Sequence, residues 1–168
     1  MSKILVTGGT GYIGSHTVVE LHNAGYTPVI VDNLSNSNIK ILDQIEKIIG
    51  IKLEFHQFDL CDVAATTAFI EANPDITGII HFAASKAVGE SVQDPLKYYH
   101  NNFFSLINLL NSYRSKQINF VFSSSCTVYG EPDVLPVTES APVKKSTSPY
   151  GNTKQIAEEI LEETANAY

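Results

Sequence analysis

Three side chains in the C-terminal half of the sequence have the types and spacing that general acid–base chemistry requires. Tyr150 and Lys154 are four residues apart, so they share one face if their segment is a helix, and Pro149 suits a helix start. An ammonium group close to a phenol favours the phenolate, which can act as a base. Ser125, the last of three consecutive serines, could orient the same ligand by a hydrogen bond. Together they could take the proton of a carbinol while a hydride leaves it. Singly, the pair also fits a helix surface and the serines a strand cap.

A second candidate site lies near the start of the chain, where Thr7–Gly14 has the sequence TGGTGYIG. Gly8 would permit a tight turn out of a strand, Gly11 a close approach of backbone to a pyrophosphate, and Gly14 close helix–sheet packing. The following helix N-terminus would face the anion. Asp32, at the end of the next predicted strand, can bind an adenosine ribose, and its charge would repel a 2′-phosphate. NAD is therefore favoured over NADP. The alternative for Asp32 alone is a turn former at a strand end.

These residues need a framework, and the hydrophobic pattern predicts a doubly wound, Rossmann-like α/β fold. Short apolar runs alternate with longer helical patterns, and uninterrupted apolarity is typical of parallel strands covered on both faces. Right-handed crossovers then run the first three strands to one side of strand one and place the next two on the other, with a ligand crevice at the reversal. The expected strands are Ile4–Thr7, Pro28–Asp32, Leu53–Gln57, Gly78–Phe82 and Asn119–Ser123, and the expected helices are Ile13–Ala24, Ile39–Ile49, Ala64–Asn73, Leu96–Ser115 and Tyr150–Ala167.

Composition narrows the class of protein further. The 168 residues, 43% of them hydrophobic, predict one NAD-binding domain over residues 1–168. A net charge of −7 without a Lys/Arg cluster argues against a nucleic-acid partner. No apolar stretch approaches the roughly 18–20 residues needed to span a membrane, so we expect a cytoplasmic protein. Cys61 and Cys126 lack the spacing of a metal site, and no metal is predicted.

Several motifs in order give the sequence a family resemblance from Lys3 to its last residue. Besides the glycine turn and Tyr150–Lys154, they are Val31–Ser37, His81–Ala84 with Lys86–Ser91, Tyr98-Tyr99 before Asn101-Asn102, and Ser123–Gly130. With these motifs the chain resembles the extended branch of the short-chain dehydrogenase/reductase family, and within it the UDP-glucose (UDP-galactose) 4-epimerases.

The resemblance implies further site residues. Ser125 and Thr127 would contact the sugar of a UDP-hexose, Tyr150 would remove its 4-hydroxyl proton, and Lys154 would bind the nicotinamide ribose. A transient 4-keto sugar would rotate and take the hydride back on its other face. The cofactor would be bound by Tyr12 and Ile13 at the pyrophosphate, by Asp32, Asn33, Leu34, Ser35, Asn36 and Ser37 at the adenosine, by Asp59 and Leu60 beside the adenine, and by Phe82, Ala83, Ala84, Ser85, Lys86 and Asn101 towards the nicotinamide.

The family pattern also implies what this sequence lacks. Related dehydratases carry an acidic pair before the Val-Tyr-Gly segment, whereas Cys126 and Thr127 stand there, which favours epimerisation. Family members continue into a C-terminal substrate domain, so we expect a truncated chain with little activity by itself. The same resemblance implies a homodimer through helices 96–115 and 150–167. The alternatives are an NAD-binding module without turnover, or an enzyme for another UDP-sugar.

Overall fold

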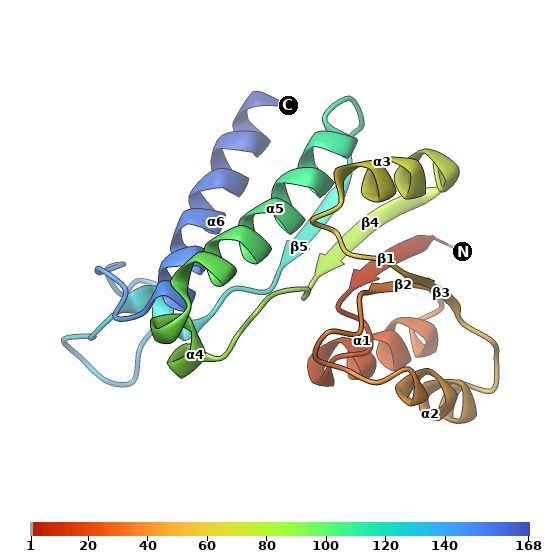
Figure 1. Ribbon diagram of the computed structural model, residues 1–168, viewed down its shortest axis with the longest axis horizontal. Helices are drawn as coiled ribbons and strands as arrows, with labels where there is room; N and C mark the ends of the chain where they lie inside the picture. Colours follow the sequence, from red (N-terminus) through yellow and green to blue (C-terminus); the bar gives the residue numbers. More distant parts are fainter. Residues whose placement is uncertain (1) are drawn as a thin grey trace. The chain divides into compact units, whose positions relative to one another are not determined.

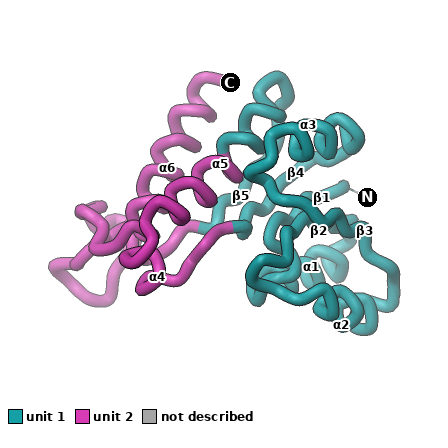
Figure 2. The backbone as a smooth tube through the Cα atoms, in the orientation of Figure 1, with its two compact units in different colours: residues 1–83, 107–123 teal, residues 84–106, 124–168 magenta. Residues whose placement is uncertain are grey.

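The computed structural model describes residues 2–168, and the chain divides into two compact units (Figure 2). Unit 1 comprises the residues up to Ala83 together with Ile107–Ser123. Unit 2 comprises Ala84–Leu106 and Ser124–Tyr168. The predicted glycine turn therefore belongs to unit 1 and the predicted Ser–Tyr–Lys set to unit 2, and each unit is described separately below.

Unit 1 contains a five-stranded parallel sheet, as the uninterrupted apolar runs predict. Its strand order is β3-β2-β1-β4-β5, so β1 is central and the order reverses beside it. The predicted doubly wound α/β class is confirmed, and the predicted strand bounds differ from the observed ones by at most two residues. Phe82 is one such difference, because β4 ends one residue before it. The strands are β1 (Lys3–Thr7), β2 (Thr27–Asp32), β3 (Glu54–Gln57), β4 (Ile76–His81) and β5 (Asn119–Phe122).

Helices cover both faces of this sheet (Figure 1). Alternate residues of a strand point to opposite faces, so Leu5 belongs to one core cluster and Val6 to the other. The first cluster is completed by Phe69 and Ile70 of α3 and by residues of α5, and the second by α1 and α2. This two-faced burial explains why the strands show no polar alternation. The helices are α1 (Tyr12–Asn23), α2 (Lys40–Ile49), α3 (Val63–Ala72) and α5 (Pro95–Tyr113), of which α5 continues from unit 2.

Unit 2 is built mainly of helices. The 19-residue helix α6 (Pro149–Ala167) begins where Pro149 predicts, and Ser148 caps it by accepting a hydrogen bond from the Gly151 amide at 3.1 Å. Two short elements, α4 (Val88–Gln93) and the 3₁₀ helix η1 (Cys126–Tyr129), were not predicted. Both help to position candidate site residues, as described below.

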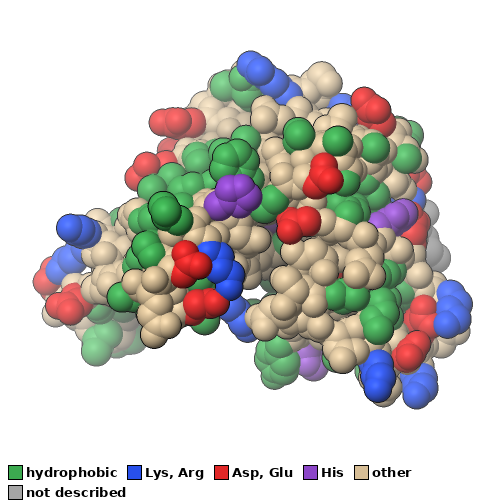
Figure 3. Space-filling view, viewed as in Figure 1, with side chains coloured by type: hydrophobic (Ala, Val, Ile, Leu, Met, Phe, Trp, Pro, Cys, Tyr) green, Lys and Arg blue, Asp and Glu red, His purple; other side chains and the backbone are tan. Residues whose placement is uncertain are grey.

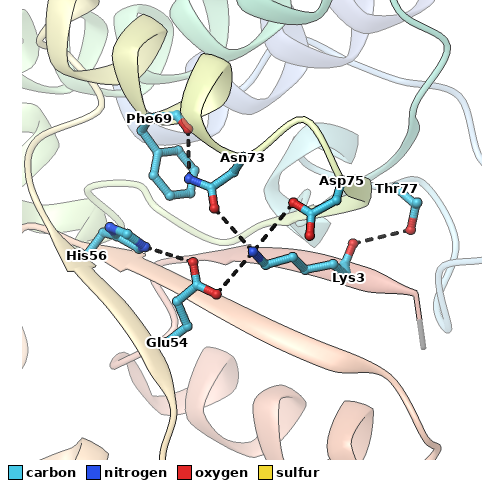
Figure 4. A network of polar contacts seen from close by, with 7 residues as sticks. All are labelled: Lys3, Glu54, His56, Phe69, Asn73, Asp75 and Thr77. Carbon is cyan, nitrogen blue, oxygen red and sulfur yellow. Dashed lines mark hydrogen bonds and ion pairs between the residues drawn. The ribbon is translucent and has the colours of Figure 1, made fainter.

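A polar network joins three segments of unit 1 at the amino ends of the strands (Figure 4). The Lys3 ammonium lies 3.1 Å from the Glu54 carboxylate, 3.5 Å from Asp75 and 3.2 Å from the Asn73 amide oxygen. Burial disfavours the charge of Lys3, but the hydrogen bonds and charges of Glu54 and Asp75 outweigh it and raise the pKa of the ammonium. Glu54 also bonds to His56 at 3.0 Å. The network links β1, β3 and the segment between α3 and β4.

The surface carries charges of both signs. In Figure 3, acidic and basic side chains gather over α2, which contains Lys40, Asp43, Glu46 and Lys47. On the face shown, basic side chains are interspersed with acidic ones rather than joined into one basic area. Between residues 2 and 168, no helix has the length and apolar character that a membrane span requires.

Candidate functional site

A pocket of about 550 Å³ opens in unit 1 beside the glycine turn. It lies between the start of α1 and the segment after β2, beyond the carboxyl ends of β1 and β2. Most of its lining residues have polar side chains. The lining residues are Thr10, Gly11, Tyr12, Ser15, His16, Ser35, Asn36, Ser37, Asn38 and Ile41. Gly11, Tyr12, Ser35, Asn36 and Ser37 of the predicted cofactor set are thus brought together.

At two positions the glycine turn is packed too closely against backbone atoms to hold a side chain. Gly8 has a φ of +68°, and a Cβ there would lie 2.8 Å from the Ala83 nitrogen. A Cβ on Gly14 would lie 2.3 Å from the Gly8 carbonyl oxygen and 2.8 Å from the Gly9 Cα. The predicted tight turn and close helix packing are both present. Their effect is to bring the first turn of α1 directly against the end of β1.

Asp32 lies at the end of β2 and accepts three hydrogen bonds within unit 1. Its Oδ1 accepts from the Leu34 amide at 2.9 Å and from the Ser37 hydroxyl at 3.1 Å, and its Oδ2 accepts from the Thr10 amide at 3.2 Å. Asp32 is therefore a turn former as well as a candidate ribose ligand, since carboxylate oxygens can each accept more than one bond. Leu34, inside this turn, has a φ of +58°, which is uncommon for a residue with a side chain.

The residues predicted beside the adenine divide into two groups. Asn33 donates to the Asp59 carboxylate at 3.1 Å, so these two side chains lie together at the surface. Leu60 is buried in the core of unit 1, and its carbonyl accepts from Thr66 at 3.1 Å and from Asn108 at 2.8 Å. Its side chain packs against the sheet instead of facing solvent.

The end of β4 approaches the glycine turn through Thr7. The Phe82 amide donates to the Thr7 carbonyl at 3.1 Å, and the Ala83 amide to its hydroxyl at 3.3 Å. The same hydroxyl lies 2.7 Å from Nδ1 of His81, which is 2% exposed and stacks on Phe122. His81 is thus a packing residue. Together with Phe82 and Ala83 it fixes the backbone at the carboxyl end of β4.

In unit 2, Tyr150 and Lys154 lie on the first turns of α6. The Lys154 ammonium is 6.0 Å from the centroid of the Tyr150 ring. Lys154 is 4% exposed, and burial lowers the pKa of its ammonium to about 8, although the charge of Glu158 acts in the opposite direction. Tyr150 is half-buried. The two side chains therefore share one helix face, as their spacing predicts, and the ammonium is close to the phenol ring.

Thr127 belongs to η1, which packs against α6, and Ser125 immediately precedes η1 as its N-cap. The Ser125 hydroxyl caps η1 by accepting from the Thr127 amide at 3.3 Å and from its hydroxyl at 2.9 Å. A Cβ on Gly151 would lie 3.0 Å from the Thr127 hydroxyl, so the backbone next to Tyr150 lies directly against η1. The structure thus brings the predicted serine segment to the start of the tyrosine helix.

Gln155 connects both ends of the long loop between η1 and α6. Its amide nitrogen donates to the carbonyls of Val128, at 2.6 Å, and of Lys144, and its oxygen accepts from the Ser146 amide at 3.3 Å. A side chain adjacent to Lys154 in the chain therefore fixes both ends of the loop that precedes Tyr150.

Asn102 is a site residue that sequence reasoning missed, although its neighbour Asn101 was selected. Its amide nitrogen donates to the Ser85 carbonyl and to the Thr153 hydroxyl, each at 3.0 Å, and its oxygen accepts from the Ser85 amide at 2.8 Å. Asn101 donates to Asn102 at 3.0 Å. The buried Asn102 links the predicted cofactor loop to the helix of Lys154. Its partners are 17 and 51 residues away, so no local pattern could identify it.

The loop that bears Ala84, Ser85 and Lys86 has a second anchor in unit 2. The Ala87 amide donates to the Tyr98 hydroxyl at 3.1 Å, and this hydroxyl donates to Glu90 at 2.6 Å. Burial, with the hydrogen bond and charge of Glu90, raises the pKa of Tyr98 to about 12. Lys86 itself is exposed. Its charge is thus available to a ligand while the backbone beside it is fixed.

Comparison with known proteins gives a consistent result. The chain is 51% identical over 164 residues to UDP-glucose 4-epimerase of Dictyostelium discoideum, covering 96% of this chain and 46% of that protein. The fold is similar to UDP-glucose 4-epimerase of Bifidobacterium longum in complex with NAD⁺ and UDP, with a TM-score of 0.94 and 42% identity over 98% of this chain and 49% of that one. It also resembles the UDP-Glc/GlcNAc 4-epimerase of Campylobacter jejuni, with a TM-score of 0.92 and 37% identity over 99% of this chain and 50% of that one.

The chain spans about half the length of the curated relatives that it matches. The family model for GDP-mannose 4,6 dehydratase matches residues 5–168, which include every candidate site residue named above. Because this match covers nearly the whole sequence, the chain belongs to the family that the GDP-mannose 4,6 dehydratase model describes.

Proposed function

We propose that this chain carries the NAD-binding and proton-transfer residues of an enzyme that interconverts UDP-glucose and UDP-galactose. The observation that carries the proposal is the pairing of Tyr150 with the buried Lys154 on α6, beside the hydroxyl segment of Ser125. Relatives called UDP-glucose 4-epimerase that are about 50% identical support it.

The residues of unit 1 fit a dinucleotide. The pocket beside Gly11 is lined by backbone and small polar groups, and the packing of Gly8 and Gly14 leaves the N-terminus of α1 at its edge. Asp32 retains lone pairs for ribose hydroxyls, and its negative charge disfavours a 2′-phosphate. When bound, NAD supplies an acceptor and donor of hydride. Asn33 and Asp59 would lie at the adenine. Ser85, Lys86 and Asn101, which belong to unit 2, would bind the cofactor towards the nicotinamide.

The side chains of unit 2 account for the proton transfer. Tyr150, as phenolate, removes the proton of the sugar 4-hydroxyl, which makes the loss of hydride from the same carbon possible. Lys154 stabilises the phenolate, and with a pKa of about 8 its amine is mainly protonated at neutral pH. Ser125 and Thr127 orient the hydroxyl. The 4-keto sugar then regains hydride on its other face, and Tyr150 returns the proton.

Epimerisation fits the site better than dehydration does. Expelling a sugar hydroxyl as water needs an acid to protonate it. At the relevant positions of η1 the chain has the thiol of Cys126 and the hydroxyl of Thr127. Neither is a carboxylic acid, so the site is suited to returning the substrate with inverted configuration.

The test is turnover by the full-length protein with Tyr150→Phe. Without its base the enzyme should lose about 10²- to 10⁴-fold in kcat for UDP-galactose, with NAD binding and helix content preserved. Tyr26→Phe is the control, because Tyr26 is 41% exposed and lies in the turn before β2. Activity of Tyr150→Phe within threefold of the parent would contradict the proposal. The same assay with UDP-N-acetylglucosamine tests the wider substrate range in the name of the Campylobacter jejuni relative.

We also propose that the protein forms homodimers through α5 and α6. On α5, Leu96 and Phe104 are 78% and 48% exposed, which leaves apolar surface on a helix that extends through both units. Sedimentation equilibrium of the parent and of a Phe104→Glu variant tests this. The charged variant should be monomeric at concentrations at which the parent is dimeric.

A further inference from the structure

Glu158 lies one helical turn beyond Lys154 on α6 and has no part in the proton transfer described above. Residues four apart share a helix face, so Tyr150, Lys154 and Glu158 follow one another along the same side of α6. The Glu158 side chain is partly buried.

Glu158 contacts the segment that carries the candidate hydroxyls. The Ser124 hydroxyl donates a hydrogen bond to its Oε1 atom. Ser124 immediately precedes Ser125, which caps η1 and bonds to Thr127. A bond between Ser124 and α6 therefore fixes the entry to η1, while Gln155 fixes its exit at the Val128 carbonyl. Both contacts come from the helix that bears Tyr150.

Glu158 also acts on Lys154 through its charge. Lys154 is almost fully buried, and burial of an ammonium favours the neutral amine. Burial lowers the pKa of Lys154 to about 8, and the negative charge of Glu158 offsets part of this lowering. A neutral amine would no longer stabilise the Tyr150 phenolate, so the carboxylate supports the form of Lys154 that the reaction needs.

We propose that Glu158 is a positioning residue for the proton-transfer pair: its carboxylate holds the Ser125 segment through Ser124 and keeps the buried Lys154 ammonium charged. The proposal rests on the proposed function, because it assigns Glu158 a part in the same reaction. On the elements that contact α6 within unit 2, the titratable groups are Glu90 of α4, Lys97, Tyr98, Tyr99 and His100 of α5, and Cys126 and Tyr129 of η1. All of them stay unchanged in the variants below.

Three variants of the full-length protein separate the two roles. Glu158→Gln removes the charge but keeps an oxygen that can accept from Ser124. Ser124→Ala removes the hydrogen bond but keeps the charge. Glu159→Gln, at the exposed neighbouring position on α6, makes the same change of net charge elsewhere and is the matched control.

Two measurements are made across pH 6–10: turnover of UDP-galactose, and the titration of Lys154 followed by NMR of protein labelled with ¹³C at the lysine Cε. In Glu158→Gln we expect the Lys154 titration and the alkaline decline of kcat to move to lower pH together, by about half a unit or more. In Ser124→Ala we expect a fall in kcat of about three- to tenfold at all pH values, with the Lys154 titration unchanged. Glu159→Gln should match the parent in both measurements.

Several results would overturn the proposal: a Lys154 titration that does not move in Glu158→Gln, an equal shift in Glu159→Gln, or full activity of Ser124→Ala. If the parent turns over no UDP-sugar, the proposed function fails. The lysine titration still decides whether Glu158 maintains the charge of Lys154.

Discussion

Replacement of Gly14 by alanine tests the packing of the glycine turn most directly. The added methyl group would lie 2.3 Å from the Gly8 carbonyl oxygen and 2.8 Å from the Gly9 Cα. Both are backbone atoms, so no side-chain rotation can relieve the contact. The first turn of α1 would have to move away from the end of β1, or the turn itself would have to open.

The size of the effect follows from two opposing contributions. Alanine within a helix is favoured over glycine by about 1 kcal/mol. Overpacking against backbone typically costs about 1–3 kcal/mol, and a contact this short belongs at the upper end of that range. We therefore expect Gly14→Ala to lower the free energy of unfolding by about 1–2 kcal/mol.

Gly89→Ala is the matched variant, because Gly89 is also within a helix, α4, but a Cβ there would meet no atom within 4 Å. In this variant the preference of helices for alanine over glycine acts without a steric clash, so the free energy of unfolding should rise by up to about 1 kcal/mol. Urea denaturation followed by far-ultraviolet circular dichroism measures both. If Gly14→Ala were as stable as Gly89→Ala, the reasoning about the glycine turn would be wrong. We further expect Gly14→Ala to bind NAD at least about tenfold more weakly, as measured by calorimetry, because the edge of the pocket must shift.

Three further predictions concern residues outside the glycine turn. Asp62→Ala should lower the free energy of unfolding by about 1 kcal/mol in urea denaturation, because Asp62 caps α3 by accepting from the amides of Ala64 and Ala65 at 2.9 and 3.0 Å. Asn102→Ala should lower the free energy of unfolding by about 1–3 kcal/mol in the same assay, because the amide and carbonyl of Ser85 and the hydroxyl of Thr153 lose this partner. A loss below about 0.5 kcal/mol would show that Asn102 does not hold these segments together. For Glu54, burial opposes the charge but the bonds from His56 and Lys3 outweigh it and lower the pKa. The contribution of Glu54 to the free energy of unfolding is thus complete above its ordinary pKa of 4.5 and is lost as the pH falls through the lower pKa of the folded state. The free energy of unfolding should therefore fall less steeply with decreasing pH in Lys3→Met than in the parent.

The sequence was a good guide to the sheet because burial on both faces leaves a clear local pattern. Leu5, Val6, Val29, Ile30 and Val31 are all fully buried, and such runs are recognisable without knowing their neighbours. The short elements were harder to predict. Helix α4 has six residues, contains Gly89, and starts at a residue without a side-chain cap, so it lacks both the length and the start signal of a helix.

For the candidate site, the spacing of two residues within one helix was more informative than the types of residues on different elements. The i, i+4 separation of Tyr150 and Lys154 places them on one face of α6 regardless of the surrounding fold. By contrast, the hydrogen-bond partners of Asn102 and the burial of Leu60 depend on which way each side chain points. That direction is decided by partners distant in the chain, such as Thr153 for Asn102 and the sheet for Leu60.

The clamp that Gln155 forms on the carbonyls of Val128 and Lys144 has a consequence for evolution and engineering. The loop between these two carbonyls begins and ends at the Gln155 side chain. A change in the length of the loop therefore need not alter the geometry of α6. Doubling the length of such an excursion adds only about 0.6 kcal/mol of closure entropy. Insertions, epitope tags or reporter peptides placed around Val134, which is 74% exposed, should therefore leave the phenol and the ammonium of α6 undisturbed.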